Sequence, residues 1–278
     1  MSINISAADV NKLRQITGAG MMDCKKALVE ASGDFDGAIE YLRKKGQKVA
    51  ANRADRTATE GAAIAKSNAD GTKGVVFVLG CETDFVAKNA DFIDFANQVA
   101  DLALNTNAAT LEDLLNTDMG GLKLSDRLTE QVGKIGEKIE ISQYALLQGA
   151  CAVPYIHAGN RVSVLAVLSK NTPALVEAGK NICMQIAAMS PVGVDESDVS
   201  EETRQRELSI GREKAIAEGK PEHLADKIAL GSLQKFMKEY TLLNQAFVKD
   251  NNLTVGQYLA SVDKESKVIT FKRVATGK

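Results

Sequence analysis

Residues 74–89 read GVVFVLGCETDFVAKN and predict a buried strand, a short charged turn and the start of a helix. Val75 to Leu79 is an apolar run of strand length. Before it, a strand over 61–66 and the turn Asn68-Ala69-Asp70-Gly71 complete a hairpin. After it, an apolar stripe with helical spacing runs through Phe92, Phe95, Ala96, Val99 and Ala100.

A second copy of this hairpin-plus-helix unit is found when Val75 is aligned with Val162. Strands over 150–156 and 162–168 flank a turn at 158–160. At the same offset, the helical stripe falls on Ile182, Cys183, Ile186 and Ala187. Because the strand and the helix agree at one offset, the sequence predicts two similar α+β subdomains. An irregular helical stretch over 111–132 and a third strand over 138–145 lie between them.

A bundle of three short helices is predicted for the first part of the chain. Ser6, followed by Asp9, is suited to cap the first helix, and the other helices are expected at 22–31 and after Asp34. Such a bundle of about 40 residues is near the lower size limit for independent folding. Its first apolar stripe runs through Val10, Leu13 and Ile16.

The turn Gly18-Ala19-Gly20 is interpreted as a helix-to-helix connection and not as a nucleotide-binding loop. A dinucleotide-binding fingerprint needs a preceding strand and a third glycine where this chain has Asp23. Adjacent helical residues point about 100° apart, so Met21 and Met22 cannot both face one small core. One exposed methionine would provide an adaptable apolar contact surface; the alternative is that the turn buries both.

Residues 41–60 carry six Lys or Arg against Asp55 and Glu60. This basic segment is either a solvated linker or a nucleic-acid-binding patch. No aromatic residue follows Tyr41 within it, which leaves stacking on single-stranded RNA unsupported and favours the linker.

A helical hairpin is predicted near the end of the chain. Ser200 starts its first helix, Gly219-Lys220-Pro221 forms the turn, and the second helix starts at Glu222. The apolar stripes of the two helices are thin, so the hairpin either projects into solvent or is covered by another chain. The expected seam consists of Leu208, Ala215, Leu224 and Ile228.

The composition excludes several classes of protein. The 278 residues carry 34 Lys and Arg against 36 Asp and Glu, a net charge of −2, so a generally basic DNA-binding surface is excluded. No apolar run is long enough for a bilayer span, and the first ten residues do not resemble a signal peptide, so we expect a cytoplasmic protein. Four widely spaced cysteines and two histidines give no zinc or disulfide pattern. Catalytic motifs are absent, and we expect a binding or regulatory protein without a cofactor or metal rather than an enzyme.

Phe85 is the residue that calls for a functional explanation. It follows a strand-to-helix turn capped by Thr83 and lies between charged Asp84 and Lys88. The ordinary expectation is that such a phenylalanine folds back into its own core. The alternative is an apolar group offered to a partner, with Asp84 orienting the contact.

Several motifs together resemble the elongation factor Ts family. Leu13-Arg14-x-x-Thr17-Gly18-Ala19-Gly20-Met21-Met22-Asp23-Cys24-Lys25-Lys26-Ala27-Leu28 resembles its N-terminal motif, and Thr83-Asp84-Phe85-Val86-Ala87-Lys88-Asn89 resembles its second motif. Shorter matches are Lys134-Ile135-Gly136-Glu137, Tyr155-Ile156-His157 and Phe247-Val248-Lys249-Asp250. The resemblance covers essentially the whole chain, in order.

The resemblance implies an α+β fold with a ubiquitin-associated-like three-helix module and a core of two similar subdomains with antiparallel sheets. It also implies a helical-hairpin dimerisation module and a short C-terminal module. The implied division is 1–46 for the helical module, 47–59 for the basic linker, 60–140 and 141–199 for the core subdomains, 200–241 for the hairpin and 242–278 for the end of the core and the C-terminal module.

The resemblance implies guanine-nucleotide exchange on elongation factor Tu, a translational GTPase, with no nucleotide, nucleic acid or membrane bound directly. The Asp84-Phe85 loop would enter the GTPase near its magnesium site. The loop residues implied are Thr83, Asp84, Phe85 and Val86. The other implied contacts are Leu13, Arg14, Met21, Met22, Lys25, Ile135, Gly136 and His157.

The chain departs from the family pattern at Asn160, Gln185, Ala246 and Val274, which affects the expected packing near the C-terminus. Two other functions remain open. An RNA-associated protein would use the basic segment and show RNA binding that depends steeply on salt. A noncatalytic scaffold would bind peptides through the helical module without accelerating nucleotide release.

Overall fold

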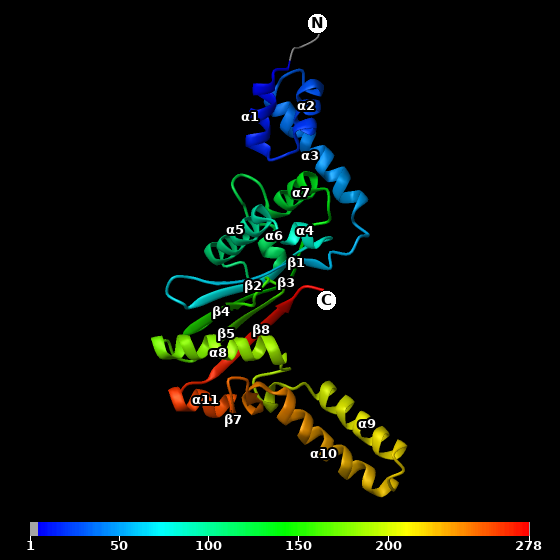
Figure 1. Ribbon diagram of the computed structural model, residues 1–278, viewed down its shortest axis with the longest axis vertical. Helices are drawn as coiled ribbons and strands as arrows, with labels where there is room; N and C mark the ends of the chain where they lie inside the picture. Colours follow the sequence, from blue (N-terminus) through cyan, green and yellow to red (C-terminus); the bar gives the residue numbers. More distant parts are fainter. Residues whose placement is uncertain (1–4, 278) are drawn as a thin grey trace. The chain divides into compact units, whose positions relative to one another are not determined.

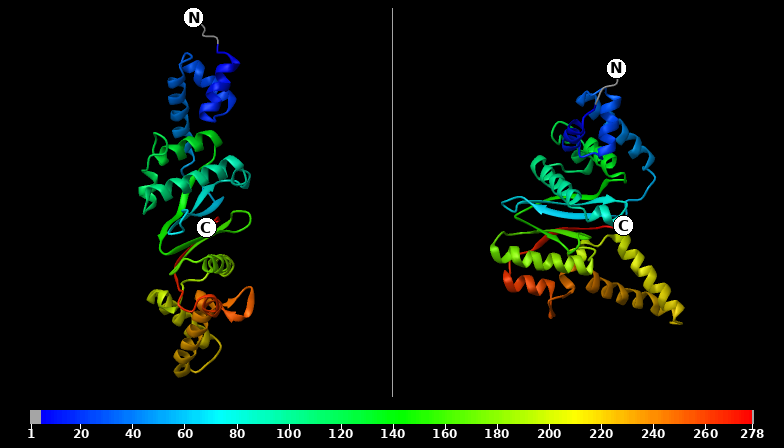
Figure 2. Two further views of the ribbon diagram at one scale, coloured as in Figure 1. Left: turned by 90° about the vertical axis from the view of Figure 1, so that its left-hand side faces the viewer. Right: turned by 45° about the horizontal axis from the view of Figure 1, so that its top comes forward.

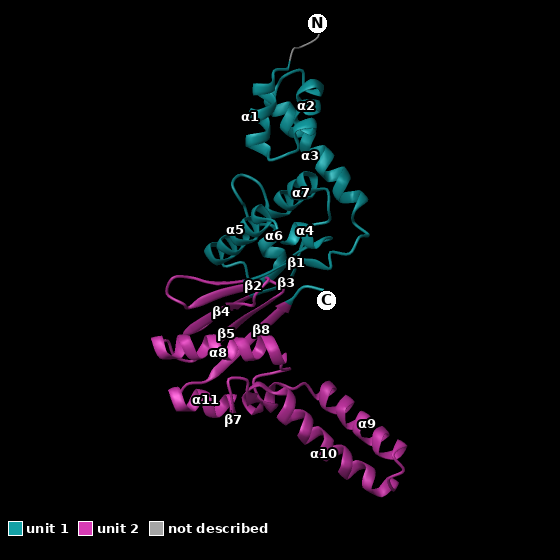
Figure 3. Cartoon of the chain, in the orientation of Figure 1, with its two compact units in different colours: residues 1–64, 77–145, 275–278 teal, residues 65–76, 146–274 magenta. Residues whose placement is uncertain are grey.

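The computed structural model describes residues 5–277 and confirms the α+β class. Residues 1–4 and 278, which belong to the expected modules 1–46 and 242–278, lie outside the described part of the chain. The chain divides into two compact units, shown in Figure 3. Unit 1 comprises residues 1–64, 77–145 and 275–278, and unit 2 comprises 65–76 and 146–274.

Unit 1 begins with the predicted three-helix bundle, formed by α1 (Ala7–Thr17), α2 (Met21–Glu30) and α3 (Phe35–Asn52) (Figure 1). Ser6 and Asp9 form a capping box, in which each side chain accepts a hydrogen bond from the other residue's backbone N–H. The first helix ends at Gly18, whose φ of +68° is a left-handed conformation that glycine adopts without strain. The core of the bundle consists of Val10, Leu13, Cys24, Ala27, Leu28 and Ala38.

Helix α3 is longer than the sequence predicts. The segment 47–59, expected to be a linker, continues the helix as far as Asn52. The reason is tertiary packing: α3 lies against α7 (Leu124–Ile135), and Gly46 and Gly133 allow their backbones to approach closely. The basic charge of residues 41–60 is mostly neutralised, because four of the six cations form ion pairs with carboxylates. The pairs are Arg43–Glu130, Lys44–Glu40, Lys45–Asp23 and Arg53–Glu82.

The first hairpin forms as predicted from β1 (Glu60–Ser67) and β2 (Lys73–Cys81). With β3 (Glu140–Gln148) they form a three-stranded sheet in the order β1-β2-β3. The helices that follow β2 are α4 (Asp84–Ala87), α5 (Ala90–Thr106) and α6 (Leu111–Leu115). Helix α5 buries one face, including Phe92, Phe95 and Val99, in the core of unit 1.

Unit 2 contains the second hairpin, β4 (Cys151–Ile156) and β5 (Val162–Leu168), paired antiparallel with Cys151 opposite Leu168. Strand β8 (Val268–Ala275) completes this sheet in the order β4-β5-β8. Helix α8 (Pro173–Met189) packs against β4 and β5. The core between them includes Val164, Ala166, Leu175, Ile182 and Ile186.

The helical stripes of the predicted internal repeat are buried in both copies. All four aligned pairs of stripe residues are buried: Phe95 with Ile182, Ala96 with Cys183, Val99 with Ile186 and Ala100 with Ala187. The copies differ in the connection between strand and helix. In the second copy, residues 169–172 lead directly from β5 to α8. In the first copy, the 82–89 connection is longer and contains the additional turn of helix α4.

Helices α9 (Glu201–Ala217) and α10 (Glu222–Tyr240) form the predicted hairpin and pack against each other; Figure 1 shows them side by side, and Figure 2 shows the hairpin from two other directions. The expected seam is partly wrong. Leu224 is 40% exposed, whereas Gly211, Ala215, Ala225 and Ala229 are buried between the helices. A Cβ at Gly211 would lie 3.0 Å from the Ala229 Cα, so small residues let the helices pack too closely for a leucine seam.

The remaining elements of unit 2 are short: η1 (Glu196–Asp198), η2 (Leu242–Asn244), β6 (Ala246–Phe247), β7 (Asp250–Thr254) and α11 (Val255–Val262). Gln185, one of the departures from the family pattern, connects α8 with β6. Its buried amide donates to Ala246 O at 3.1 Å, and its oxygen accepts from Val248 N at 2.8 Å. In the described part of the chain, no helix is both long and apolar enough to cross a membrane.

Candidate functional site

The four residues 83–86, named here the Phe85 turn, project an aromatic side chain into solvent. Thr83 caps α4 as predicted, because its hydroxyl accepts a hydrogen bond from Val86 N at 3.4 Å. Phe85 is 84% exposed, so the expectation that it folds back into its own core is wrong. Asp84 forms an ion pair with Lys88 at 2.6 Å on the next turn. An exposed Phe loses the ~1.5–3 kcal/mol that burial of its side chain would contribute.

Glu137 holds the backbone of the Phe85 turn from the segment that follows α7. Its Oε2 accepts hydrogen bonds from Glu82 N at 3.1 Å and Thr83 N at 3.0 Å. Its Oε1 accepts the Thr83 hydroxyl hydrogen at 2.7 Å. One carboxylate therefore satisfies three donors at the start of the turn.

Glu82, immediately before the turn, in return accepts a hydrogen bond from the segment that contains Glu137. Its carboxylate accepts from Lys138 N at 2.7 Å, and both of its oxygens accept from the same Arg53 nitrogen, Nη1, at 2.8 and 3.0 Å. The backbone N–H of Lys138 and the Arg53 guanidinium hold the pKa of Glu82 below its usual range, against the opposing effect of burial.

A groove of about 470 Å³ lies beside the Phe85 turn, within unit 1. Three segments line it: the turn after α1, the 82–89 connection with the start of α5, and the end of α7. Four of the predicted partner-binding residues meet there, namely Arg14, Met21, Val86 and Ile135. The resemblance assigned these residues from three separate motifs, and the fold brings them to one surface.

The other predicted residues have different positions. Met22 is 75% exposed and Met21 51%, so the alternative in which the turn buries both is wrong. Lys25 is exposed on the same helix, and Gly136 ends α7 with a φ of +82°. Leu13 is fully buried in the helical bundle, so its side chain supports the surface from beneath and cannot contact a partner.

His157 belongs to unit 2, and is exposed just after β4. Its Nδ1 lies 3.0 Å from the Tyr155 hydroxyl, which orients the imidazole ring. When the hydroxyl is the donor, the proton of the neutral ring is on Nε2, and this N–H is available to an acceptor.

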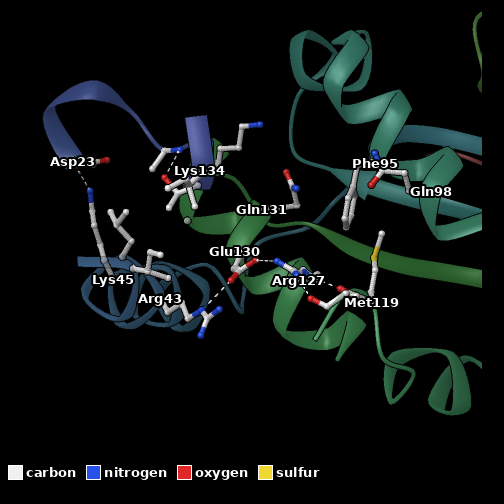
Figure 4. A pocket seen from close by; sticks show the side chains of 17 residues that line it. Asp23, Arg43, Lys45, Phe95, Gln98, Met119, Arg127, Glu130, Gln131 and Lys134 are labelled. Carbon is white, nitrogen blue, oxygen red and sulfur yellow. Dashed lines mark hydrogen bonds and ion pairs between the residues drawn. The ribbon is translucent and has the colours of Figure 1, made fainter. Parts of the chain in front are cut away.

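A second cleft, of about 530 Å³, lies between the helical bundle and α5 and α7 (Figure 4). Its walls carry paired charges: Lys45 points toward Asp23, and Arg43 and Arg127 both point toward Glu130 (Figure 4). These ion pairs connect α2 to α3 and α3 to α7, so the cleft contributes to the attachment of the bundle.

The cysteines are not suited to nucleophilic chemistry. All four are buried, and burial raises the pKa of the Cys81 and Cys183 thiols to about 12. Among residues 5–277, no group of three or more His, Cys, Asp or Glu side chains could hold a metal ion. The surface around Phe85 combines exposed apolar side chains, Phe85 and Met21, with the charged side chain of Arg14.

Glu137, Glu82 and Arg53 were not among the predicted site residues. Glu137 belongs to the motif Lys134-Ile135-Gly136-Glu137, but its partner Thr83 is 54 residues away in the sequence. Neither periodicity nor a local turn pattern reports a contact at that separation.

Comparison with known proteins identifies the class. A model of the family described as Elongation factor TS matches residues 82–278. The relative named Elongation factor Ts from Christiangramia forsetii is 56% identical over 273 residues, which covers 98% of this chain and 99% of that protein. The one from Flavobacterium psychrophilum is 52% identical with the same coverage, and the one from Clostridium perfringens is 42% identical over 97% of this chain and 93% of that protein.

The chain is thus an elongation factor of protein synthesis. More narrowly, it belongs to the elongation factor Ts family.

Proposed function

We propose that this chain is a guanine-nucleotide exchange factor that releases GDP from elongation factor Tu during translation elongation. Family membership supports the class of activity. The observation that carries the proposal is Phe85, an aromatic side chain that is 84% exposed on a turn whose backbone is held at its start by Glu137. Protein synthesis would place this activity in the cytoplasm.

In the proposed mechanism, Asp84 and Phe85 enter the GTPase near its magnesium ion. Magnesium bridges the phosphates of the nucleotide, so disturbing its ligands weakens several charge-assisted contacts at once. Phe85 would gain on binding the apolar burial that it lacks in the free protein. By thermodynamic linkage, if this chain weakens GDP binding, GDP weakens the binding of this chain by the same factor.

The groove beside the Phe85 turn would hold a second part of the GTPase. Arg14 provides positive charge, and Met21, Val86 and Ile135 provide an apolar lining. Methionine adapts to irregular apolar surfaces, so Met21 and exposed Met22 suit a contact with a partner helix. Lys25 would lie at the rim of this contact, and His157 would make a separate contact from unit 2.

The helical hairpin would pair with a second copy of this chain. Its two helices contact each other through small residues and leave several larger apolar side chains exposed. These are Ile210, Ile216, Leu224 and Leu230, which are 50, 44, 40 and 55% exposed. Burial against another hairpin would cover them, and a two-fold dimer is the commonest arrangement for such pairing.

A stopped-flow measurement tests the exchange function. Elongation factor Tu loaded with fluorescent GDP is mixed with excess unlabelled GDP, with and without this chain. We expect the release rate to rise with the concentration of this chain and then saturate. An unchanged release rate at saturating binding would contradict the proposal and favour a noncatalytic scaffold.

An RNA-binding role is less well supported, because Arg43, Lys44, Lys45 and Arg53 are already paired with carboxylates. Titration with RNA at low and high salt provides the comparison. Tight binding with a steep salt dependence would restore that alternative.

A further inference from the structure

The Phe85 turn cannot hold its own shape. Helix α4 has four residues, Asp84–Ala87, which is about one helical turn. A single turn is costly to nucleate, because several backbone dihedral angles are fixed for one hydrogen bond. Its own cap, Val86 N to the Thr83 hydroxyl, is long at 3.4 Å. Apolar anchoring is also weak, since no residue of α4 is buried. Apart from the exposed Asp84–Lys88 ion pair, the order of the turn must therefore come from contacts outside it.

The contacts from outside form a reciprocal pair of caps. The Glu137 carboxylate accepts from the backbone at Glu82 and Thr83, and the Glu82 carboxylate accepts from the backbone at Lys138. Each glutamate therefore fixes the chain segment on which the other is located. Hydrogen bonds to a charged acceptor are stronger than those between neutral groups. Glu137 acts on the turn directly, because the Thr83 hydroxyl that it orients is also the cap of α4.

The same network extends to the end of α3. Arg53, the residue after α3, forms an ion pair with Glu82 through its Nη1. The Lys138 ammonium donates to the carbonyls of Ala54 and Arg56 at 3.1 and 2.9 Å. Three segments of unit 1, at 53–56, 82–83 and 137–138, are therefore joined by side-chain-to-backbone contacts and one ion pair.

We propose that Glu137 and Glu82 are positioning residues for the exchange reaction: their reciprocal caps keep the Phe85 turn ordered, so that Phe85 is held out of the core and ready to enter the partner. The effect on exchange rests on the proposed function, whereas the effect on the turn does not. Glu137 never touches the nucleotide or the GTPase in this role. Because Glu137 orders the turn in the free protein, the conformational entropy of the turn is not lost again when the partner binds.

The order of the turn can be measured without any partner. The chain contains no tryptophan, so Phe85→Trp introduces a single fluorescent reporter at the exposed position. We expect Glu137→Ala in this background to lower the fluorescence anisotropy of the reporter and to speed deuterium exchange of the amides at 82–86. Glu112→Ala, which removes an exposed carboxylate from α6, is the matched control and should change neither.

Glu137→Gln keeps the shape of the side chain and one acceptor oxygen, and it covers the case in which Glu137→Ala does not fold. It should give an intermediate anisotropy, because its amide group cannot accept the third hydrogen bond. If the reporter and the amides at 82–86 are as ordered in both variants as in the control, the proposal is overturned whatever the exchange assay shows.

The exchange assay then separates positioning from general structural support. With Phe85 present, we expect Glu137→Ala to lower the maximal rate of GDP release about tenfold, corresponding to about 1.4 kcal/mol, with a smaller change in the half-saturating concentration. In a Phe85→Ala background, Glu137→Ala should change the rate of GDP release little further, because the side chain that Glu137 positions is absent. A full tenfold loss in that background would contradict action through Phe85.

Failure of the proposed function has a different result. If the Phe85→Ala variant stimulates GDP release at the same rate as the unmodified chain, the proposed exchange mechanism is wrong. The anisotropy and deuterium-exchange results would still decide whether Glu137 orders the turn.

Discussion

Gly46 on α3 and Gly133 on α7 meet backbone to backbone, and a Cβ added at Gly133 would lie 2.8 Å from the Gly46 Cα. This contact lies on the same pair of helices as the Arg43–Glu130 ion pair. The attachment of the helical bundle within unit 1 therefore depends on the absence of two side chains.

Gly133→Ala should lower the midpoint of thermal unfolding, although alanine is the better helix former. The helix gains about 1 kcal/mol of propensity. The new methyl group meets backbone that cannot rotate away, and overpacking costs about 1–3 kcal/mol. Gly231→Ala is the matched control, since its Cβ meets nothing within 4 Å. It should raise stability by about 1 kcal/mol, and an equal gain at Gly133 would show that the helices can separate freely.

Phe85→Ala should slow stimulated GDP release more than about tenfold without changing thermal stability. The loss of an aromatic anchor at an interface costs about 2–4 kcal/mol, whereas the free protein loses no core contact. Phe92→Ala is the opposite control, because Phe92 is 3% exposed and its truncation should cost about 3–5 kcal/mol of folding stability. Calorimetry and stopped-flow exchange measure the two effects. A large fall in the melting temperature of Phe85→Ala would indicate a core role for this side chain.

Replacing both Met21 and Met22 by alanine should weaken the complex with elongation factor Tu and leave the fold intact. Both side chains are exposed, and each is expected to contribute about 1 kcal/mol or more if it is buried on binding. Val29→Ala on the same helix removes a side chain that is 56% exposed but does not line the groove. Titration calorimetry should show a loss of affinity for the double variant only. Equal affinities for all three proteins would remove the methionines from the interface.

Glu82 should make folding stability depend on pH in the acid range. Its pKa is lower in the folded chain than the ordinary value of 4.5, so its contribution is present above the unfolded-state pKa. That contribution is lost as the pH falls through the folded-state pKa. Between pH 5 and pH 3, the free energy of unfolding should therefore fall less steeply for Glu82→Gln than for the unmodified chain. Parallel pH profiles for the two proteins would show that Glu82 does not contribute.

Removing residues 201–236, with a short Gly-Ser linker in their place, should abolish self-association and preserve single-turnover exchange. This deletion keeps Met237 and Thr241, which are buried in unit 2. Light scattering on both proteins, alone and with the GTPase, measures the masses. The same masses for the two proteins in every mixture would leave the hairpin as a solvated projection.

The features predicted from sequence were those that local rules determine. The caps at Ser6, Thr83 and Ser200 follow from side-chain chemistry at helix starts, and all three are confirmed. The repeated hairpin-plus-helix unit follows from apolar periodicity, which reports burial over several residues.

The features that were missed depend on tertiary contacts. Whether Phe85 is buried could not be decided, because one residue has no periodicity. The continuation of α3 to Asn52 depends on a glycine contact with α7. The hydrogen bonds from the Phe85 turn to Glu137 join residues that are distant in sequence. The hairpin seam was misjudged at Leu224, because the helices approach closely at Gly211 and are packed through small residues instead.

The internal repeat has a consequence for the Phe85 turn. Both copies have the same number of residues between strand and helical stripe, since Val75 and Val162, like Phe95 and Ile182, are 87 positions apart. The first turn of α8, residues 173–176, therefore corresponds to residues 86–89, where α4 ends and α5 has not yet begun. The same length of chain forms the start of a continuous helix in one copy and a separate helical turn with an exposed aromatic side chain in the other.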